Sequence, residues 1–178
     1  AEVTDRIHLM LLKATEEARV SAGVDFQFPS DGTIVVIGNS MGGELSKVGT
    51  LRAHIPDILE SIRHTPEFQE MDEDSGERLL AELSETLSQR TPAITEDSLV
   101  GSAASTLAGR LSGYLKVFGG NMTVDAACAS SLAAVTVASE MLQSGRCSCA
   151  VVGGVDSDLT IDTFASFCRL KALSATVS

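Results

Sequence analysis

Three short apolar runs, each separated from the next by a helical pattern, restrict the folds that this chain can adopt. The runs cover residues 33–37, 122–124 and 149–155. The first is a β-branched run bounded by glycines and the last is apolar, which is typical of strands that are buried on both faces. Helical patterns at 4–22 and 130–142 complete an alternation of helices and strands. That alternation predicts an α/β fold in which the strands lie between helical layers.

The helix at 4–22 is predicted from apolar residues that recur at helical spacing, namely Ile7, Leu11, Ala14 and Ala18. Thr4 is predicted to cap this helix and Gly23 to end it. A second helix, rich in Gly, Ala and Ser, is expected over 99–115, followed by a turn at Gly119 and Gly120. Small residues in a helix reduce helix propensity but allow another backbone to approach closely. The GNSMGG run at 38–43 misses the spacing of a phosphate-binding loop, so we interpret it as a strand-to-loop turn.

An acidic helical region interrupts the α/β pattern at residues 51–90. One predicted helical face carries four leucines, Leu79, Leu80, Leu83 and Leu87. The acids Glu77, Glu82 and Glu85 fall on other faces, as on a solvated surface. Pro92 is expected to end the region. The sequence therefore predicts one domain over 1–178 with a helical acidic insert at about 51–98.

Charge and cysteine spacing exclude several classes of function. The net charge of −11 and pI of about 4.6 argue against a nucleic-acid partner and against an anionic membrane surface. No apolar run approaches membrane-spanning length. The four cysteines form no CxxC pair and the three histidines lie far upstream, so no metal site is expected. Free thiols in such a chain indicate the cytoplasm.

The stretch TVDAACASSLAAV places Cys128 where a predicted strand meets a predicted helix. First-turn N–H groups of a helix have no partner within the helix, so their field stabilises a thiolate and can hold a developing oxyanion. Ser130 and Ser131 are expected to cap that helix. Local physics leaves two interpretations open, an activated nucleophile and a thiol packed at a strand–helix junction. For the other cysteines, Cys147, Cys149 and Cys168, packing is the better interpretation.

The longer run NMTVDAACASSLAAVTVA resembles the active-site signature of the β-ketoacyl synthases, where a cysteine stands in a [TV]-V-D-[TA]-A-C-[SA]-S-S-L context. The likeness continues upstream in AGRLSGYLKVFGG and downstream in SGRCSCAVVGGVD and FCRLKALSAT. The opening DRIHLMLLKATEEARVSAG resembles an early helix of that family. The acidic insert and the DAACASSL motif are most similar to those of ketosynthases from polyunsaturated fatty acid synthases and iterative type I polyketide synthases.

The resemblance implies a thiolase-like layered αβαβα fold, of which this chain would be the N-terminal half. Cys128 would accept an acyl chain as a thioester from the phosphopantetheine of an acyl carrier protein, with no cofactor bound directly. Its backbone N–H would supply half of the oxyanion hole. A malonyl unit would lose CO2, and the resulting carbanion would attack the thioester. The small-residue helix and the strand before Cys128 would belong to a homodimer interface.

The family also uses two histidines and a lysine from its C-terminal half, and no residue here matches their motifs. His8, His54 and His64 are assigned no role. The chain is therefore expected to be the N-terminal portion of a ketosynthase domain, without its first strand, that condenses nothing by itself.

Three alternatives compete with this interpretation. The first is a non-catalytic chain-length partner of a ketosynthase, but such partners replace the cysteine that is present here. The second is a Cys-dependent acyl hydrolase or transferase on an unrelated fold, which would need its own His and Asp. Asp125 precedes Cys128 by three residues along an expected strand, and its side chain is predicted to point to the opposite face. The third is a purely structural dimerisation module.

Overall fold

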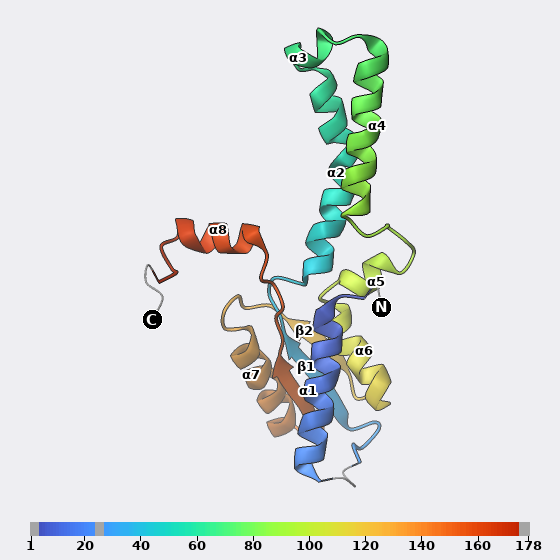
Figure 1. Ribbon diagram of the computed structural model, residues 1–178. Helices are drawn as coiled ribbons and strands as arrows, with labels where there is room; N and C mark the ends of the chain where they lie inside the picture. Colours follow the sequence, from blue (N-terminus) through green and yellow to red (C-terminus); the bar gives the residue numbers. More distant parts are fainter. Residues whose placement is uncertain (1–3, 24–26, 175–178) are drawn as a thin grey trace. The chain divides into compact units, whose positions relative to one another are not determined.

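The computed structural model describes residues 4–23 and 27–174, and the chain divides into two compact units. Of the described residues, the first unit takes in Thr4 and 45–102, and the second takes in 5–44 with the chain from Ala103 onward. Figure 1 draws the helices and strands of both. The predicted insert at 51–98 lies inside the first unit, while its status as an insert in a larger domain stays a prediction.

The second unit is built on a parallel sheet of three strands. These are β1 (Thr33–Gly38), β2 (Asn121–Val124) and β3 (Cys149–Gly154), in the order β2-β1-β3. In the register of the central strand, Val36 pairs with Met122 on one side and with Val152 on the other. All three predicted strands are present, and the predicted α/β class is confirmed.

Helices cover both faces of the sheet (Figure 1). They are α1 (Arg6–Ala22), α6 (Thr106–Leu115) and α7 (Ser130–Gln143). On one face, α1 and α6 pack on the strand with a core of Ile7, Leu11, Val35, Ile37, Leu107, Ala108, Leu111 and Val117. On the other face α7 packs with Ile34, Val36, Ala134, Ala138 and Cys147. Every residue of β1 is buried because side chains on both of its faces meet a helix.

The prediction that β3 is fully buried was wrong. Its residues are half-buried, apart from the exposed Gly154. Among the strands that the structure describes, β3 lies at an edge of the sheet and pairs only with β1. A cavity of about 310 Å³ also lies between β3 and α1, so part of that strand face lacks a covering side chain.

Two helix boundaries differ from those predicted. Asp5 caps α1 in place of Thr4, because its carboxylate accepts the Ile7 N–H at 3.1 Å. Gly23 ends the helix as predicted. The single helix expected over 99–115 is instead α5 (Ser98–Ser102) and α6.

The break between α5 and α6 has a polar anchor. The Ala104 carbonyl accepts the Thr123 hydroxyl from β2 at 3.0 Å, and the Ala103 carbonyl accepts the Thr106 hydroxyl. Gly and Ser in this stretch lower helix propensity, so these bonds compete successfully with a continuous helix.

The first unit is a helical hairpin with α2 (Glu44–Arg63), α3 (Pro66–Gln69) and α4 (Glu73–Gln89). The predicted leucine stripe is narrower than expected, since Leu80 is buried and Leu79 is 38% exposed. Arg52 of α2 donates to the carbonyl oxygens of Ser88 and Thr91 at 2.7 and 3.1 Å, which joins the two long helices. Among the described residues, no helix is both long and apolar enough to cross a membrane.

Candidate functional site

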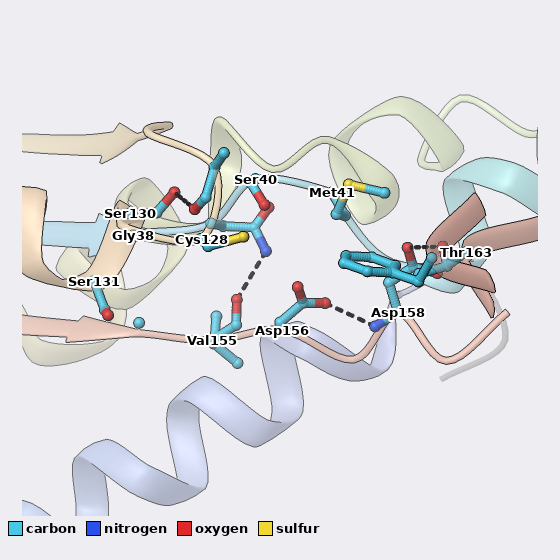
Figure 2. Close-up of a pocket in the computed structure, with 14 residues that line it drawn as sticks. Gly38, Ser40, Met41, Cys128, Ser130, Ser131, Val155, Asp156, Asp158 and Thr163 are labelled. Carbon is cyan, nitrogen blue, oxygen red and sulfur yellow. Dashed lines mark hydrogen bonds between the residues drawn. The ribbon is translucent and has the colours of Figure 1, made fainter. Parts of the chain in front are cut away.

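A cavity of about 530 Å³ opens at the carboxyl ends of the three strands. Open parallel sheets commonly bind ligands at this edge, because the loops that leave neighbouring strands converge there. Three segments supply most of the lining (Figure 2): 38–41 after β1, 127–131 after β2, and 154–158 after β3. Thr163 and Phe167 of α8 (Ile161–Arg169) complete it. Cys128 is the one thiol among these lining residues.

Cys128 is exposed and stands two residues before the first residue of α7. The strand-to-helix position predicted for it is therefore confirmed. Ala127, immediately before it, has φ of +50°. A positive φ is uncommon for a residue with a Cβ, and such strain concentrates at functional sites. The chain turns sharply here and presents the Cys128 side chain at the cavity (Figure 2).

Hydrogen bonds fix this turn, residues 125–129, from both sides. The Ala127 N–H donates to the Asp125 carboxylate at 2.9 Å. The Ser130 hydroxyl donates to the Ala127 carbonyl at 2.6 Å and accepts the Ala126 N–H at 2.9 Å. Ser130 was predicted to cap α7, but its hydroxyl braces the preceding turn instead. Ala129 occupies the N-cap position without a side-chain cap, and Ser131 does not supply one either.

Two glycines allow the first turn of α7 to lie directly on the sheet. A Cβ atom added to Gly38 would overlap the backbone of Ser130, and would lie 2.6 Å from the Ser131 nitrogen. A Cβ added to Gly154 would lie 2.6 Å from the Ser131 Cβ. Real Cβ contacts are longer than this, so α7 could not keep its place if either residue were alanine. The glycines at the ends of β1 and β3 thereby determine where Cys128 sits.

Two carboxylates line the side of the cavity formed after β3. The Asp156 carboxylate accepts the Asp158 N–H at 2.8 Å. Asp158 is 8% exposed and accepts the hydroxyls of Thr160 and Thr163, both at 2.6 Å. A buried carboxylate needs such donors, and these hold the start of α8 against the loop. Among the described lining residues there is no Lys, Arg or His.

None of the three histidines lines the Cys128 cavity. His54, on α2 of the other unit, and His64, just after α2, are exposed. His8 of α1 is 3% exposed, and neither of its ring nitrogens has a hydrogen-bond partner in the part of the chain that is described. Burial lowers the pKa of His8, the charge of Arg110 lowers it further, and the Asp5 carboxylate opposes both effects. The imidazole is a neutral core group, and the geometry assigns it no catalytic role.

The other three cysteines differ in environment. Cys147 is 8% exposed and belongs to the core beneath α7, which confirms the packing prediction for it. Cys149 is half-buried at the start of β3. Cys168 was predicted to pack, and that prediction was wrong, because α8 buries none of its residues among those described. No group of acids, histidines or cysteines in the described residues is placed to hold a metal ion.

Sequence reasoning missed Asn39, which it treated as part of a turn. Asn39 is 4% exposed, follows β1 directly and lines the same cavity. A polar residue placed immediately after a fully apolar strand was the available signal, since such positions face the carboxyl edge of a parallel sheet.

Comparison with known families supports the resemblance. A family model described as "Beta-ketoacyl synthase, N-terminal domain" matches residues 1–178, the whole of the chain. This match confirms the resemblance and the thiolase-like fold expected from it.

Known relatives match about half of the chain. A reducing polyketide synthase, ppsB, of Aspergillus oryzae is 42% identical over 79 residues, which are 44% of this chain and 3% of that protein. The fatty acid synthase of Anser anser anser is 36% identical over 94 residues, or 53% of this chain and 27% of the relative. The pikromycin polyketide synthase component PikAII of Streptomyces venezuelae is 43% identical over 74 residues, which are 42% of this chain and 2% of that protein. The chain thus spans a small part of each of these relatives.

Proposed function

Because the chain belongs to the β-ketoacyl synthase family, we propose that it contributes the acyl-accepting half of a condensing site for fatty acid or polyketide synthesis. The observation that carries this proposal is the place of Cys128. It is exposed at a braced strand-to-helix turn, in a cavity at the carboxyl edge of a parallel sheet. A thiol held there is accessible to a substrate while its backbone is rigid.

The first step is the transfer of an acyl group to Cys128. The Cys128 sulfur attacks the carbonyl carbon of an acyl thioester carried on the phosphopantetheine of an acyl carrier protein. A new C–S bond forms, the old one breaks, and the thiol proton passes to the leaving pantetheine sulfur. The neighbouring amides of Ala127 and Ala129 are engaged with Asp125 and with the Ala126 carbonyl. The Cys128 amide between them is the proposed donor to the oxyanion.

The second step joins a two-carbon unit to the bound acyl chain. A malonyl group on the carrier protein loses CO2, its carbanion attacks the Cys128 thioester, and the Cys128 thiolate leaves. The cavity described contains no histidine to promote the loss of CO2. We therefore propose that the residues for decarboxylation are additional to those described, and that this stretch by itself is inactive in condensation.

The lining of the cavity supports an uncharged acyl thioester as the group that enters. Apolar atoms of Met41, Val155 and Phe167 form much of the wall, and the charged groups there are the carboxylates of Asp156 and Asp158. An apolar wall beside negative charge favours a hydrocarbon chain over a free acid. A polyunsaturated fatty acid synthase or an iterative polyketide synthase stays the proposed setting, with the cytoplasm as its location.

A homodimer is a further part of the proposal. The helix α6, which forms the second part of the small-residue stretch, leaves Tyr114 53% exposed and Phe118, just beyond it, 70% exposed. They lie near β2, whose Met122 is 37% exposed. Exposed aromatic and apolar side chains next to an edge strand are typical of an interface. Light scattering of the full-length protein should give a dimeric mass, and a monomeric mass at micromolar concentration would remove this part of the proposal.

A Cys-dependent hydrolase is the strongest competing function. It requires a base near the sulfur, but the cavity holds no histidine and the Asp125 carboxylate is bonded to the Ala127 N–H within the turn. A non-catalytic chain-length partner is also less well supported, because Cys128 is present and exposed. A purely structural dimerisation module would leave the thiol unused, which acylation can test.

Acylation of the thiol is the test of the proposed function. The full-length protein is incubated with an acyl-pantetheine thioester, and peptides are mapped by mass spectrometry. We expect one acyl group, on Cys128, and none in Cys128→Ala, with Cys168→Ala behaving as the wild type. Acylation of Cys168 or of no cysteine would contradict the proposal, and release of free acid at a high rate would favour the hydrolase.

A further inference from the structure

We propose that Asn39 is a positioning residue for Cys128, which fixes the turn that carries the thiol relative to the two loops facing it. This inference rests on the function proposed above, because it concerns how the same thiol meets its substrate. Asn39 does not itself touch the reacting atoms in the scheme. It acts through the backbone groups that it joins, at the edge where all three strands end.

Asn39 makes a hydrogen bond to the end of each neighbouring strand. Its backbone N–H donates to the carbonyl of Val124, the last residue of β2, at 3.1 Å. Its side-chain Nδ2 donates to the carbonyl of Val155, the residue after β3, at 2.8 Å (the dashed line to Val155 in Figure 2). Asn39 itself follows β1, so one residue connects the carboxyl ends of all three strands.

The same side chain also shapes its own loop. Its Oδ1 accepts the Gly42 N–H at 3.0 Å, and Gly42 has φ of +71°, a conformation suited to glycine. The loop between them carries Ser40 and Met41 into the cavity. The side chain is therefore used as donor and acceptor at once, in different directions. Asparagine is the shortest residue that offers both groups from one planar amide.

The connected strand ends lead directly to residues that line the cavity. Val124 continues through only three residues to Cys128, and Val155 leads directly to Asp156 in the opposite wall. A loss of the side-chain bonds would let the β3 loop move relative to the β1 loop and the turn, while the backbone bond to Val124 keeps the turn against β1. A displacement of about 1 Å at a reacting centre can cost roughly 100-fold in rate. At 4% exposure water cannot readily replace these bonds, so the loss is not compensated.

Substitutions can separate the parts of this role. In Asn39→Asp the acceptor for Gly42 remains, but a carboxylate oxygen faces the Val155 carbonyl and repels it. In Asn39→Ser a hydroxyl can still accept from Gly42 but is too short to reach Val155. Asn121→Asp is the matched control, because it makes the same chemical change on an exposed residue at the opposite end of β2.

The measured quantity is the single-turnover rate constant for acylation of Cys128 by an acyl-pantetheine in full-length protein. We expect this rate constant to fall about 10- to 100-fold in both Asn39 variants, with little change in its dependence on the acyl-pantetheine concentration. In Asn121→Asp the rate constant should not change. A purely structural role would lower the fraction of folded protein but leave the rate constant of the folded fraction unchanged. Wild-type rate constants in folded Asn39 variants would overturn the inference.

A second measurement keeps this inference distinct from the proposed function. Cys128 is alkylated with iodoacetamide and, separately, with a maleimide that bears a long alkyl chain, and the ratio of the two rates is compared among variants. We expect the ratio to change at least 3-fold in the Asn39 variants, because the walls around the thiol move. If wild-type Cys128 is not acylated but the ratio changes, the proposed function fails and the positioning role stands. An unchanged ratio together with an unchanged acylation rate constant would overturn the positioning role proposed for Asn39.

Discussion

Gly38 and Ser130 lie so close together that a single methyl group between them could not be accommodated. A Cβ atom on Gly38 would overlap the carbonyl group of Ser130, at the point where the end of β1 meets the first turn of α7. Cys128 is two residues before that turn. The distance between strand and helix at this one contact therefore sets the position of the thiol relative to the sheet.

Replacement of this glycine should move the thiol. In Gly38→Ala the backbone of α7 must shift, because the clashing atoms belong to main chain and not to the end of a flexible side chain. We expect a loss of roughly 1–3 kcal/mol in the free energy of unfolding, as for other overpacked sites. The acylation rate of Cys128 should fall at least 10-fold. Urea denaturation and the single-turnover assay measure the two effects.

The control is Gly113→Ala, in α6 of the same unit. A Cβ there would meet no heavy atom within 4 Å, and the backbone is helical. This variant should gain up to about 1 kcal/mol in stability, because alanine favours a helix over glycine. Equal effects of the two substitutions would show that the contact between Gly38 and Ser130 does not constrain the turn.

Ser130→Ala should weaken the same turn from the other side. Ser130 is 5% exposed, and its hydroxyl bonds both the Ala126 N–H and the Ala127 carbonyl. Its removal takes the side-chain partner from two part-buried backbone groups, and we expect a loss of about 1 kcal/mol in unfolding free energy. Ser131→Ala is the matched control, with an expected change below about 0.5 kcal/mol, because Ser131 is exposed. Thermal and urea unfolding of both variants checks the difference.

The sequence predicted those parts of this site that depend on local pattern. The strand at β1 follows from an uninterrupted β-branched run, and the helix that begins at Ser130 follows from the alternation of strand and helix. Together they placed Cys128 at a strand end, where the structure has it. The family motif adds the chemistry, because it specifies the cysteine and not only its position.

The predictions that were wrong or missing concern contacts between residues that are far apart in the sequence. Ser130 satisfies the preceding turn and not the helix end, which only the close approach at Gly38 explains. Asn39 binds Val155, which is 116 positions away in the chain, so no local pattern could reveal it. Cys168 was expected to pack from its apolar neighbours, but α8 has no buried residue among those described. Periodicity tells which face is apolar and not what covers it.

Cysteine accessibility gives a direct test of the packing described here. With iodoacetamide on the folded protein, Cys128 and Cys168 should be alkylated within minutes and Cys147 should be protected, because only Cys147 lies in the core. In about 6 M guanidinium, where the chain is unfolded, all four cysteines should react. Peptide mapping at several times provides the rates. Rapid alkylation of Cys147 in the folded state would contradict the core beneath α7.

In the helical unit, Arg52 should contribute more to stability than Arg63. Arg52 is half-buried and donates to carbonyls at the end of α4, whereas Arg63 forms an exposed pair with Glu77 at 3.0 Å. Arg52→Gln should cost about 1–3 kcal/mol, because part-buried carbonyls lose a charged donor. Arg63→Gln should leave the urea midpoint nearly unchanged, as is usual for exposed ion pairs. The urea midpoints of both variants measure the difference in stability. The acylation of Cys128 should be unchanged in both variants.

Stability should fall on acidification through His8. Burial lowers the pKa of this imidazole below its ordinary value of 6.5, with Arg110 acting in the same direction and Asp5 against it. The unfolded chain therefore binds a proton at a higher pH than the folded one, so the contribution of His8 is fully present above pH 6.5 and is lost as the pH falls below it. In His8→Leu an apolar side chain replaces an imidazole that has no hydrogen-bond partners among the described residues. Because leucine binds no proton, the urea midpoint should change less between pH 7.5 and about 5.5 than in the wild type. Equal slopes in His8→Leu and the wild type would show that the buried imidazole does not govern acid stability.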